Sequence, residues 1–139
     1  IHFTGFILGE MKANLLASCD LFCSPSPYET FGRTVVEAMA SGIPVLTVES
    51  GAVSEYILDG INGYLVPPND AEKLANCIEK VLLNNNTDLI QEALEDSRQF
   101  SLDQGCENLD RFYQQLMGVS EENEESIRLS KTGANSNVI

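Results

Sequence analysis

Four short apolar runs divide the first half of the chain, and each is bounded by glycine, proline, aspartate or asparagine. Runs of this length predict β-strands; they cover residues 3–8, 21–24, 43–48 and 63–66. Between them lie segments whose apolar residues recur at helical spacing, at residues 10–18, 33–41 and 53–58. Strand and helix therefore alternate, which predicts right-handed βαβ units and an α/β fold of Rossmann-like type, a parallel sheet with flanking helices.

The later part of the chain is predicted to be helical. Asp70 is placed to cap a helix over Ala71–Leu83, because its carboxylate can accept from an unpaired amide of the first turn. Two further amphipathic segments follow at residues 88–100 and Leu102–Met117. The aromatic pair at positions 112 and 113 follows the helical spacing of the last segment, so these two side chains are expected in a core.

The length and composition predict one domain with a polar extension. The chain has 139 residues, of which 43% are hydrophobic, which is enough for one core. From Gly118 onward the composition is polar and acidic, and few large apolar residues remain to offset the entropy of ordering. We therefore expect a partial Rossmann-like domain over residues 1–117 and a flexible acidic tail over residues 118–139.

The charge balance narrows the possible partners. Eight basic and 21 acidic residues give a net charge of −13, and no cluster of lysine or arginine offers the positive surface that nucleic acid requires. We expect no nucleic-acid partner. The apolar runs are too short to span a bilayer, no secretion signal opens the sequence, and the four cysteines read as buried reduced thiols, so a cytoplasmic location is predicted.

Glu37 is the feature of the sequence that calls for a chemical explanation. The segment 31–41 is apolar nearly all round apart from this carboxylate, which predicts a buried helix with one ionised group that must be paired. Two partners are open at this point. One is Arg33, a single helical turn away; the other is a ligand with hydroxyl groups.

The loop before this helix supplies the elements of a phosphate site. It follows a predicted strand, and ligands of open parallel sheets bind beyond the carboxyl ends of the strands. The amides of Gly32, Arg33 and Thr34 lie at the positive end of the helix and can hold an anion. With Glu29 in the loop and Glu37 two turns along the helix, a phosphate between two hydroxyl-bearing groups fits the arrangement, which is the layout of a nucleotide sugar.

Three segments carry a resemblance to a known family. Glu29 and Glu37, with seven residues between them, match the EX7E motif of retaining GT-B glycosyltransferases of family 4. The segment 51–55 is similar to the Gly-Gly-x-Pro-Glu segment of that family, although Ala52 replaces the second glycine. The segment 59–67 is similar to its Asp-Gly-x-Asn-Gly-x-Leu-Val-x-Pro sequence. The chain thus resembles the C-terminal, nucleotide-sugar-binding domain of a GT-B enzyme.

The resemblance implies a role for each residue of the candidate site. Glu29 would act in catalysis by binding hydroxyls of the transferred sugar, and Glu37 would bind the ribose diol. The backbone amides from Phe31 through Gly32 and Arg33 to Thr34 would hold sugar and diphosphate, and Ile7 would contact the nucleobase; these roles follow from the resemblance. The donor would be a UDP-, GDP- or ADP-linked hexose transferred with retention of configuration, with no metal and no other cofactor.

The resemblance also implies parts that this sequence does not contain. The family has two further strands and diphosphate-neutralising cations before position 3, and an N-terminal domain that would hold an acceptor sugar or lipid. We therefore expect a truncated chain that is inactive alone, that can associate with itself through an exposed sheet edge, and whose complete enzyme can lie at a membrane. The alternative is a non-catalytic sugar-nucleotide-binding or assembly module. An epimerase of the same architecture fits the motifs less well.

Overall fold

The computed structural model describes residues 1–118. The chain divides into two units, Ile1–Phe100 and a second that begins at Ser101. The predicted division of the chain at residue 117 stays a prediction. Apart from Gly118, the predicted flexible tail lies outside the described residues.

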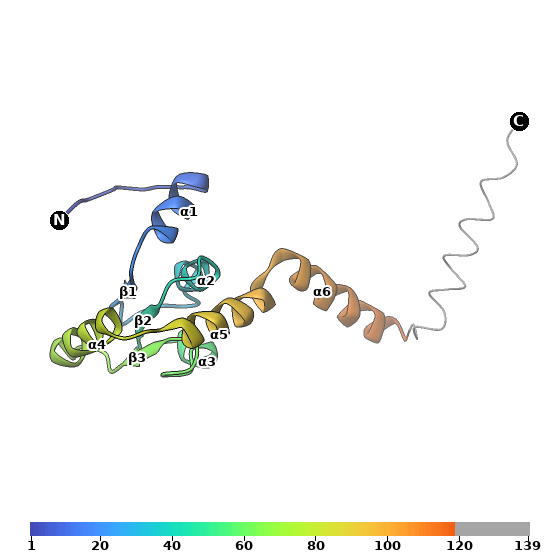
Figure 1. Ribbon diagram of the computed structural model, residues 1–139. Coiled ribbons are helices and arrows are strands. Elements are labelled where there is room, and N and C mark those ends of the chain that lie inside the picture. Colours follow the sequence, from blue (N-terminus) through green and yellow to red (C-terminus); the bar gives the residue numbers. More distant parts are fainter. Residues whose placement is uncertain (119–139) are drawn as a thin grey trace, which may run out of the picture. The chain divides into compact units, whose positions relative to one another are not determined.

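A three-stranded parallel sheet forms the centre of the first unit (Figure 1). Its strands are β1 (Phe22–Ser24), β2 (Val45–Val48) and β3 (Tyr64–Val66), in the order β1-β2-β3. Phe22 pairs with Val45, and Leu46 pairs with Tyr64. Helices connect successive strands and cover the sheet, so the predicted α/β fold with a parallel sheet and flanking helices is confirmed.

The strand predicted over residues 3–8 is wrong. This segment contains no strand, and all of its residues except Ile7 are exposed. A strand is stable only when its backbone groups are paired, and within the described residues the outer side of β1 has no neighbour in the sheet. β1 is therefore an edge strand, and the apolar segment before α1 (Gly9–Ala17) lies in an irregular conformation.

The helices predicted between and after the strands are confirmed, with ends that differ by a few residues. They are α2 (Arg33–Ala40), α3 (Val53–Tyr56), α4 (Ala71–Leu83) and α5 (Thr87–Ser97), followed by the short helix η1 (Arg98–Phe100). Asp70 caps α4 as predicted, because its side chain accepts a hydrogen bond of 2.9 Å from the Lys73 amide. This bond lowers the pKa of the Asp70 carboxyl.

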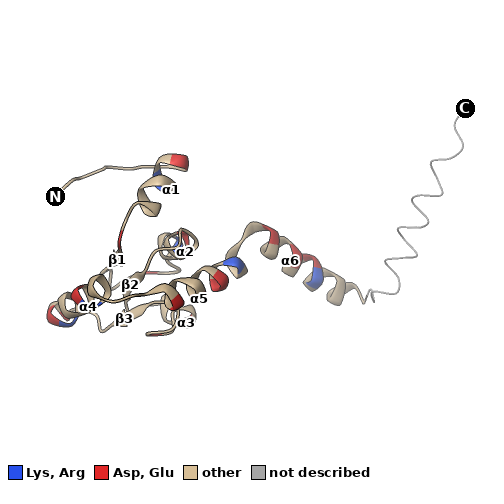
Figure 2. Cartoon of the chain, in the orientation of Figure 1, with Lys and Arg blue, Asp and Glu red and all other residues tan. Residues whose placement is uncertain are grey.

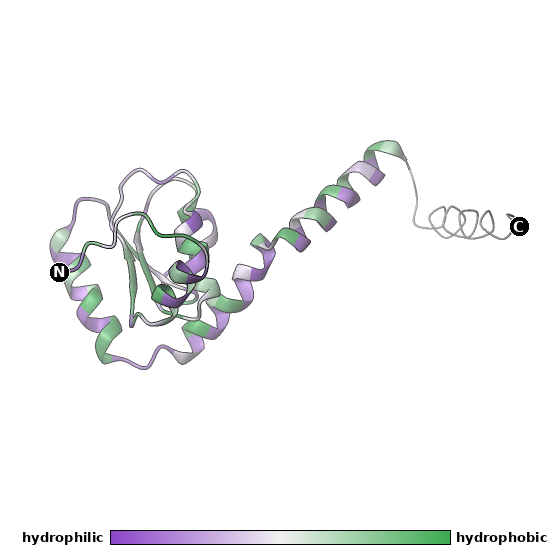
Figure 3. Cartoon of the chain, turned by 90° about the horizontal axis from the view of Figure 1, so that it is seen from above, coloured by the Kyte–Doolittle hydropathy of each residue, from purple (hydrophilic) through white to green (hydrophobic). Residues whose placement is uncertain are grey.

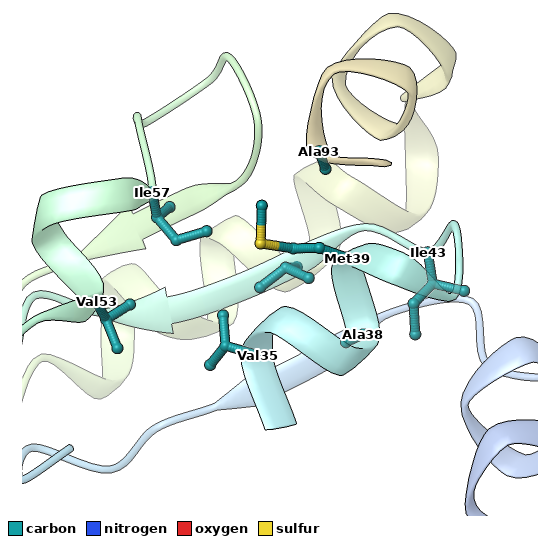
Figure 4. Packing of buried hydrophobic residues seen from close by; sticks show 8 residues of the cluster. Val35, Ala38, Met39, Ile43, Val53, Ile57 and Ala93 are labelled. Carbon is teal, nitrogen blue, oxygen red and sulfur yellow. The ribbon is translucent and has the colours of Figure 1, made fainter. Parts of the chain in front are cut away.

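Two hydrophobic clusters cover the two faces of the sheet. Successive residues of a strand point to opposite faces, so Val45 belongs to one cluster and Leu46 to the other. Met39 and its neighbours on α2 and α3 pack with Val45 in the first cluster (Figure 4). Residues of α4 pack with Leu46 in the second. The hydropathy colours show the apolar strands enclosed between amphipathic helices (Figure 3).

The charged residues avoid the sheet. No strand contains a lysine, arginine, aspartate or glutamate, and the charges lie on helices and connecting segments (Figure 2). None of the helices within residues 1–118 combines the length and the apolar character that a bilayer span needs.

The second unit begins with α6 (Leu102–Met117), whose bounds match the prediction. The core role predicted for its aromatic residues is wrong, since Phe112 is 54% and Tyr113 52% exposed. α6 is an amphipathic helix, and its unit contains no second described element that could cover its apolar face.

The cysteines are free thiols, as expected, but they are less buried than predicted. Cys19, Cys23 and Cys77 are partly buried, whereas Cys106 on α6 is exposed. Burial raises the pKa of Cys23 and of Cys77. These two thiols are therefore held in their protonated, poorly nucleophilic form.

Candidate functional site

Glu37 is paired with a residue that the sequence did not suggest. The Lys12 ammonium donates to Glu37 Oε1 at 2.6 Å, whereas Arg33 is exposed and forms no ion pair within residues 1–118. The local alternative of an Arg33–Glu37 pair is therefore wrong. The helix is also less enclosed than predicted, because Glu37 is 29% exposed and one side of α2 faces solvent.

The second oxygen of this carboxylate has no partner. Glu37 Oε2 is buried, and no described group donates a hydrogen bond to it. A buried carboxylate oxygen without a donor is costly, since it has lost its contact with water and has gained nothing in return. The arrangement is therefore suited to receive a hydrogen-bond donor from outside the chain.

A cavity of about 330 Å³ lies beside this carboxylate. It brings together three of the residues predicted for the site, namely Ile7, Thr34 and Glu37. Lys12 lines it as well, and Phe6 and Phe22 supply apolar wall. A cavity with apolar walls and a few converging polar groups is the usual form of a small-molecule site.

Glu29 is in a different position from Glu37. Its Oε1 accepts a hydrogen bond of 3.0 Å from the Gly32 amide, so one of the three amides predicted to be free is occupied from within the loop. The amides of Arg33 and Thr34 donate to no acceptor among the described residues. Glu29, Phe31, Gly32 and Arg33 do not line the cavity beside Glu37.

Gly32 joins the loop to α2 in a conformation that fixes this contact. It is the N-cap of α2 with φ of 80°, a left-handed conformation that glycine adopts without strain. A Cβ at this position would lie 2.8 Å from the Tyr56 hydroxyl. The close approach holds the start of α2 against α3.

An aromatic cluster that was not predicted from the sequence holds the same loop. The rings of Phe31, Tyr56 and Phe100 lie with centroids 5.1 to 5.8 Å apart, and the Tyr56 hydroxyl donates to the Phe31 carbonyl at 2.7 Å. Burial and then the charge of Glu29 raise the pKa of Tyr56 to about 12. The three aromatic residues are too far apart in the sequence for a local pattern to connect them.

Tyr56→Phe is expected to loosen the loop that carries Glu29. The variant keeps the ring contacts and removes the hydrogen bond to Phe31, at a cost of about 1 kcal/mol in the free energy of unfolding.

The raised pKa of Tyr56 favours the protonated phenol in the folded state. The wild type therefore loses stability as the pH rises above about 10, where the unfolded chain begins to ionise, and the loss continues towards about 12. Urea titrations at about pH 8 and about pH 11 measure both effects. An equal loss of stability with pH in Tyr56→Phe and wild type would contradict the assignment.

No three histidine, cysteine, aspartate or glutamate side chains lie together as a metal-binding group in residues 1–118. The polar groups at the cavity are an ammonium, a carboxylate and a hydroxyl. The chemistry of these groups is that of hydrogen bonding to a polyhydroxylated ligand.

Comparison with known proteins identifies the family of this chain. The model of the family described as "Glycosyl transferases group 1" matches residues 1–100. The chain belongs to the glycosyl transferases group 1 family. The matched residues include both glutamates, the cavity and the aromatic cluster.

This member of the glycosyl transferases group 1 family is similar in sequence or structure to proteins that include a sucrose synthase and a sucrose-phosphate synthase. A sucrose synthase of Acidithiobacillus caldus is 39% identical over 77 residues, which cover 52% of this chain and 10% of that protein. The sucrose-phosphate synthase of Thermosynechococcus elongatus has a TM-score of 0.76 and 31% identity, over 86% of this chain and 31% of that one.

Anabaena HepE, solved in complex with UDP-glucose, has a TM-score of 0.57 and 35% identity, over 61% of this chain and 24% of that one. In each of these three comparisons the chain spans less than a third of the other protein's length.

Proposed function

We propose that the chain is the nucleotide-sugar-binding part of a retaining GT-B glycosyltransferase of family 4. The complete enzyme would transfer a hexose from a UDP-, GDP- or ADP-linked donor to a sugar or lipid acceptor held by an N-terminal domain. The observation that carries the proposal is the buried, unpartnered Oε2 of Glu37, a residue that lines a cavity of about 330 Å³. The complex of HepE with UDP-glucose supports the class of ligand.

The proposal gives each polar group of the cavity a task. Glu37 accepts hydrogen bonds from the ribose diol, and Ile7, which lines the same cavity, packs on the nucleobase. Thr34 lines the cavity and lies in the first turn of α2, where the free amides of Arg33 and Thr34 and the positive end of the helix favour an anionic diphosphate.

The transferred sugar would lie on the side of the loop that carries Glu29. Because Glu29 accepts from the Gly32 amide, its carboxylate is oriented before any ligand binds, and its remaining lone pairs can accept from sugar hydroxyls. The Phe31 and Gly32 backbone supports this position through the Tyr56 hydrogen bonds. The departing diphosphate would be stabilised by the amides and dipole of α2 rather than by a metal ion, and attack from the face of departure would retain the anomeric configuration.

The charge distribution favours a second candidate, a non-catalytic sugar-nucleotide-binding or assembly module. Lys12 and Arg33 are the basic residues among the first 69 positions, against seven acids. Lys12 is engaged by Glu37, so Arg33 is left to neutralise a diphosphate. The isolated chain would then be inactive, and the unpaired outer edge of β1 offers a route to self-association.

Glu37→Gln tests the proposed donor site. Titration of the chain with UDP-, GDP- and ADP-glucose and with GDP-mannose is expected to show weak binding of at least one donor, lowered about 10- to 100-fold by the substitution, because a hydrogen bond to a charged acceptor is lost. Glu79→Gln removes an exposed glutamate of α4 and serves as the control, with unchanged binding. Equal affinities for wild type and Glu37→Gln would contradict the role of Glu37, and no binding of any donor would favour the assembly module.

A further inference from the structure

Lys12 forms an ion pair with Glu37, and both residues line the cavity. Lys12 lies on α1, 25 residues before Glu37, and its ammonium donates to Oε1 at 2.6 Å. The two side chains are exposed to the same degree, 29% each. A charge-assisted hydrogen bond this short holds Glu37 Oε1 in place.

The ion pair leaves the two carboxylate oxygens in different states. Oε1 has its donor, whereas Oε2 is buried and has none. If Lys12 were absent, Glu37 would be free to turn either oxygen towards solvent, because its side chain is partly exposed. With Lys12 in place, the carboxylate of this cavity-lining residue is held with one acceptor left unsatisfied.

Stabilisation of the fold does not account for this arrangement. An ion pair with about a third of each side chain exposed contributes little net stability, about 1 kcal/mol or less, and the unpartnered Oε2 acts against even that contribution. The Lys12–Glu37 ion pair is better explained by a role in ligand binding, because it holds the carboxylate at the cavity. Phe22, Leu16 and Ile7 line the same cavity, and a hydrogen bond formed beside apolar side chains is stronger than one formed in bulk water.

We propose that Lys12 is a positioning residue for hydroxyl recognition: by holding Glu37 Oε1 it keeps the carboxylate in the cavity wall with Oε2 left for a ligand hydroxyl, and it thereby makes the site select a ribonucleotide over its deoxy counterpart. This inference rests on the function proposed above. It assigns to Lys12 a task in specificity, exerted through Glu37 and without contact with the diphosphate. A ligand lacking the hydroxyl leaves Oε2 buried and unpaired, and that penalty is the source of the selection.

The test compares the binding of UDP, GDP and ADP with that of their 2′-deoxy and 3′-deoxy forms to the 139-residue chain. Wild type is expected to prefer the ribonucleotide over at least one deoxy form by about tenfold or more. In Lys12→Met that ratio is expected to fall towards one, because the carboxylate is no longer held. In Lys12→Arg, which keeps a cationic donor, the ratio is expected to recover in large part. Lys73→Met removes a lysine that is 62% exposed on α4 and is expected to leave the ratio unchanged.

Each result decides between the inference and its alternatives. An unchanged ratio in Lys12→Met, with the chain folded by circular dichroism, overturns the role of Lys12 while the proposed function stands. A wild type that binds ribo and deoxy forms equally overturns it as well. If no nucleotide binds to the wild type, the proposed function fails and this inference falls with it. If Lys12→Met does not fold, Lys12→Gln takes its place, with the same expected fall in the ratio.

Discussion

Gly51→Ala is expected to destabilise the chain by about 3 kcal/mol or more and to displace the loop that carries Glu29. A Cβ at position 51 would lie 2.0 Å from the backbone oxygen of Glu29, so the backbone itself must move. The residue also has φ of 48°, a conformation that costs a non-glycine residue about 1 to 2 kcal/mol. Strain and overpacking act together here.

Gly42→Ala separates the two contributions. Gly42 has φ of 70°, but nothing lies within 4 Å of the Cβ that it would gain. Its substitution therefore carries the conformational cost alone, about 1 to 2 kcal/mol. Urea unfolding of both variants gives the difference that the contact with Glu29 causes. If Gly51→Ala is no less stable than Gly42→Ala, the close approach of the two loops is incorrect. A displaced loop would also weaken donor binding in Gly51→Ala and leave it intact in Gly42→Ala.

Asn62→Ala is expected to cost about 3 kcal/mol or more, because this buried amide satisfies three groups at once. Its Oδ1 accepts from the Leu58 amide at 2.7 Å, and its Nδ2 donates to the Tyr56 carbonyl at 2.9 Å and to Asp96 Oδ2 at 2.6 Å. Asn62 itself is fully buried. Truncation leaves buried polar groups without partners, which costs about 1 to 3 kcal/mol for each.

A control and a second variant sharpen this prediction. Asn76→Ala removes an exposed asparagine from α4, and it is expected to leave stability unchanged or to raise it slightly, since alanine favours a helix. Asn62→Asp keeps the shape and replaces the amide donor by an oxygen that faces Asp96. Its deficit relative to wild type is expected to be smaller at about pH 4 than at about pH 7, because protonation of one carboxyl restores a donor. Thermal or urea unfolding that shows Asn62→Ala within about 0.5 kcal/mol of wild type would contradict the assigned role.

The local patterns of the sequence predicted most of the fold. The bounds of α4 and α6 and the three strands were accessible because apolar spacing, capping aspartate and turn residues lie close together in the chain. The absence of a strand over residues 3–8 could not be predicted in this way, because an apolar run becomes a strand only when a neighbouring strand pairs with it. No pattern within one segment shows whether that neighbour exists.

The candidate site was predictable in part. The residues set by local sequence patterns were found, and the contacts between distant segments were not. The glutamates and the start of α2 follow from a motif and from the position of a loop after a parallel strand. Ile7 was placed by the family resemblance alone. Lys12 was missed because its partner lies 25 residues away, and the contact of Asn62 with Asp96 was missed because these residues are 34 positions apart. Side-chain contacts between residues so far apart produce no periodic pattern in the sequence.

The position of α5 has a consequence for how the first unit unfolds. Ala93 belongs to the cluster with α2 and α3, whereas Leu89, one turn earlier, belongs to the cluster with α4. Detaching this single helix would therefore uncover both sides of the sheet together. The two hydrophobic clusters thus share α5, and we expect them to unfold together.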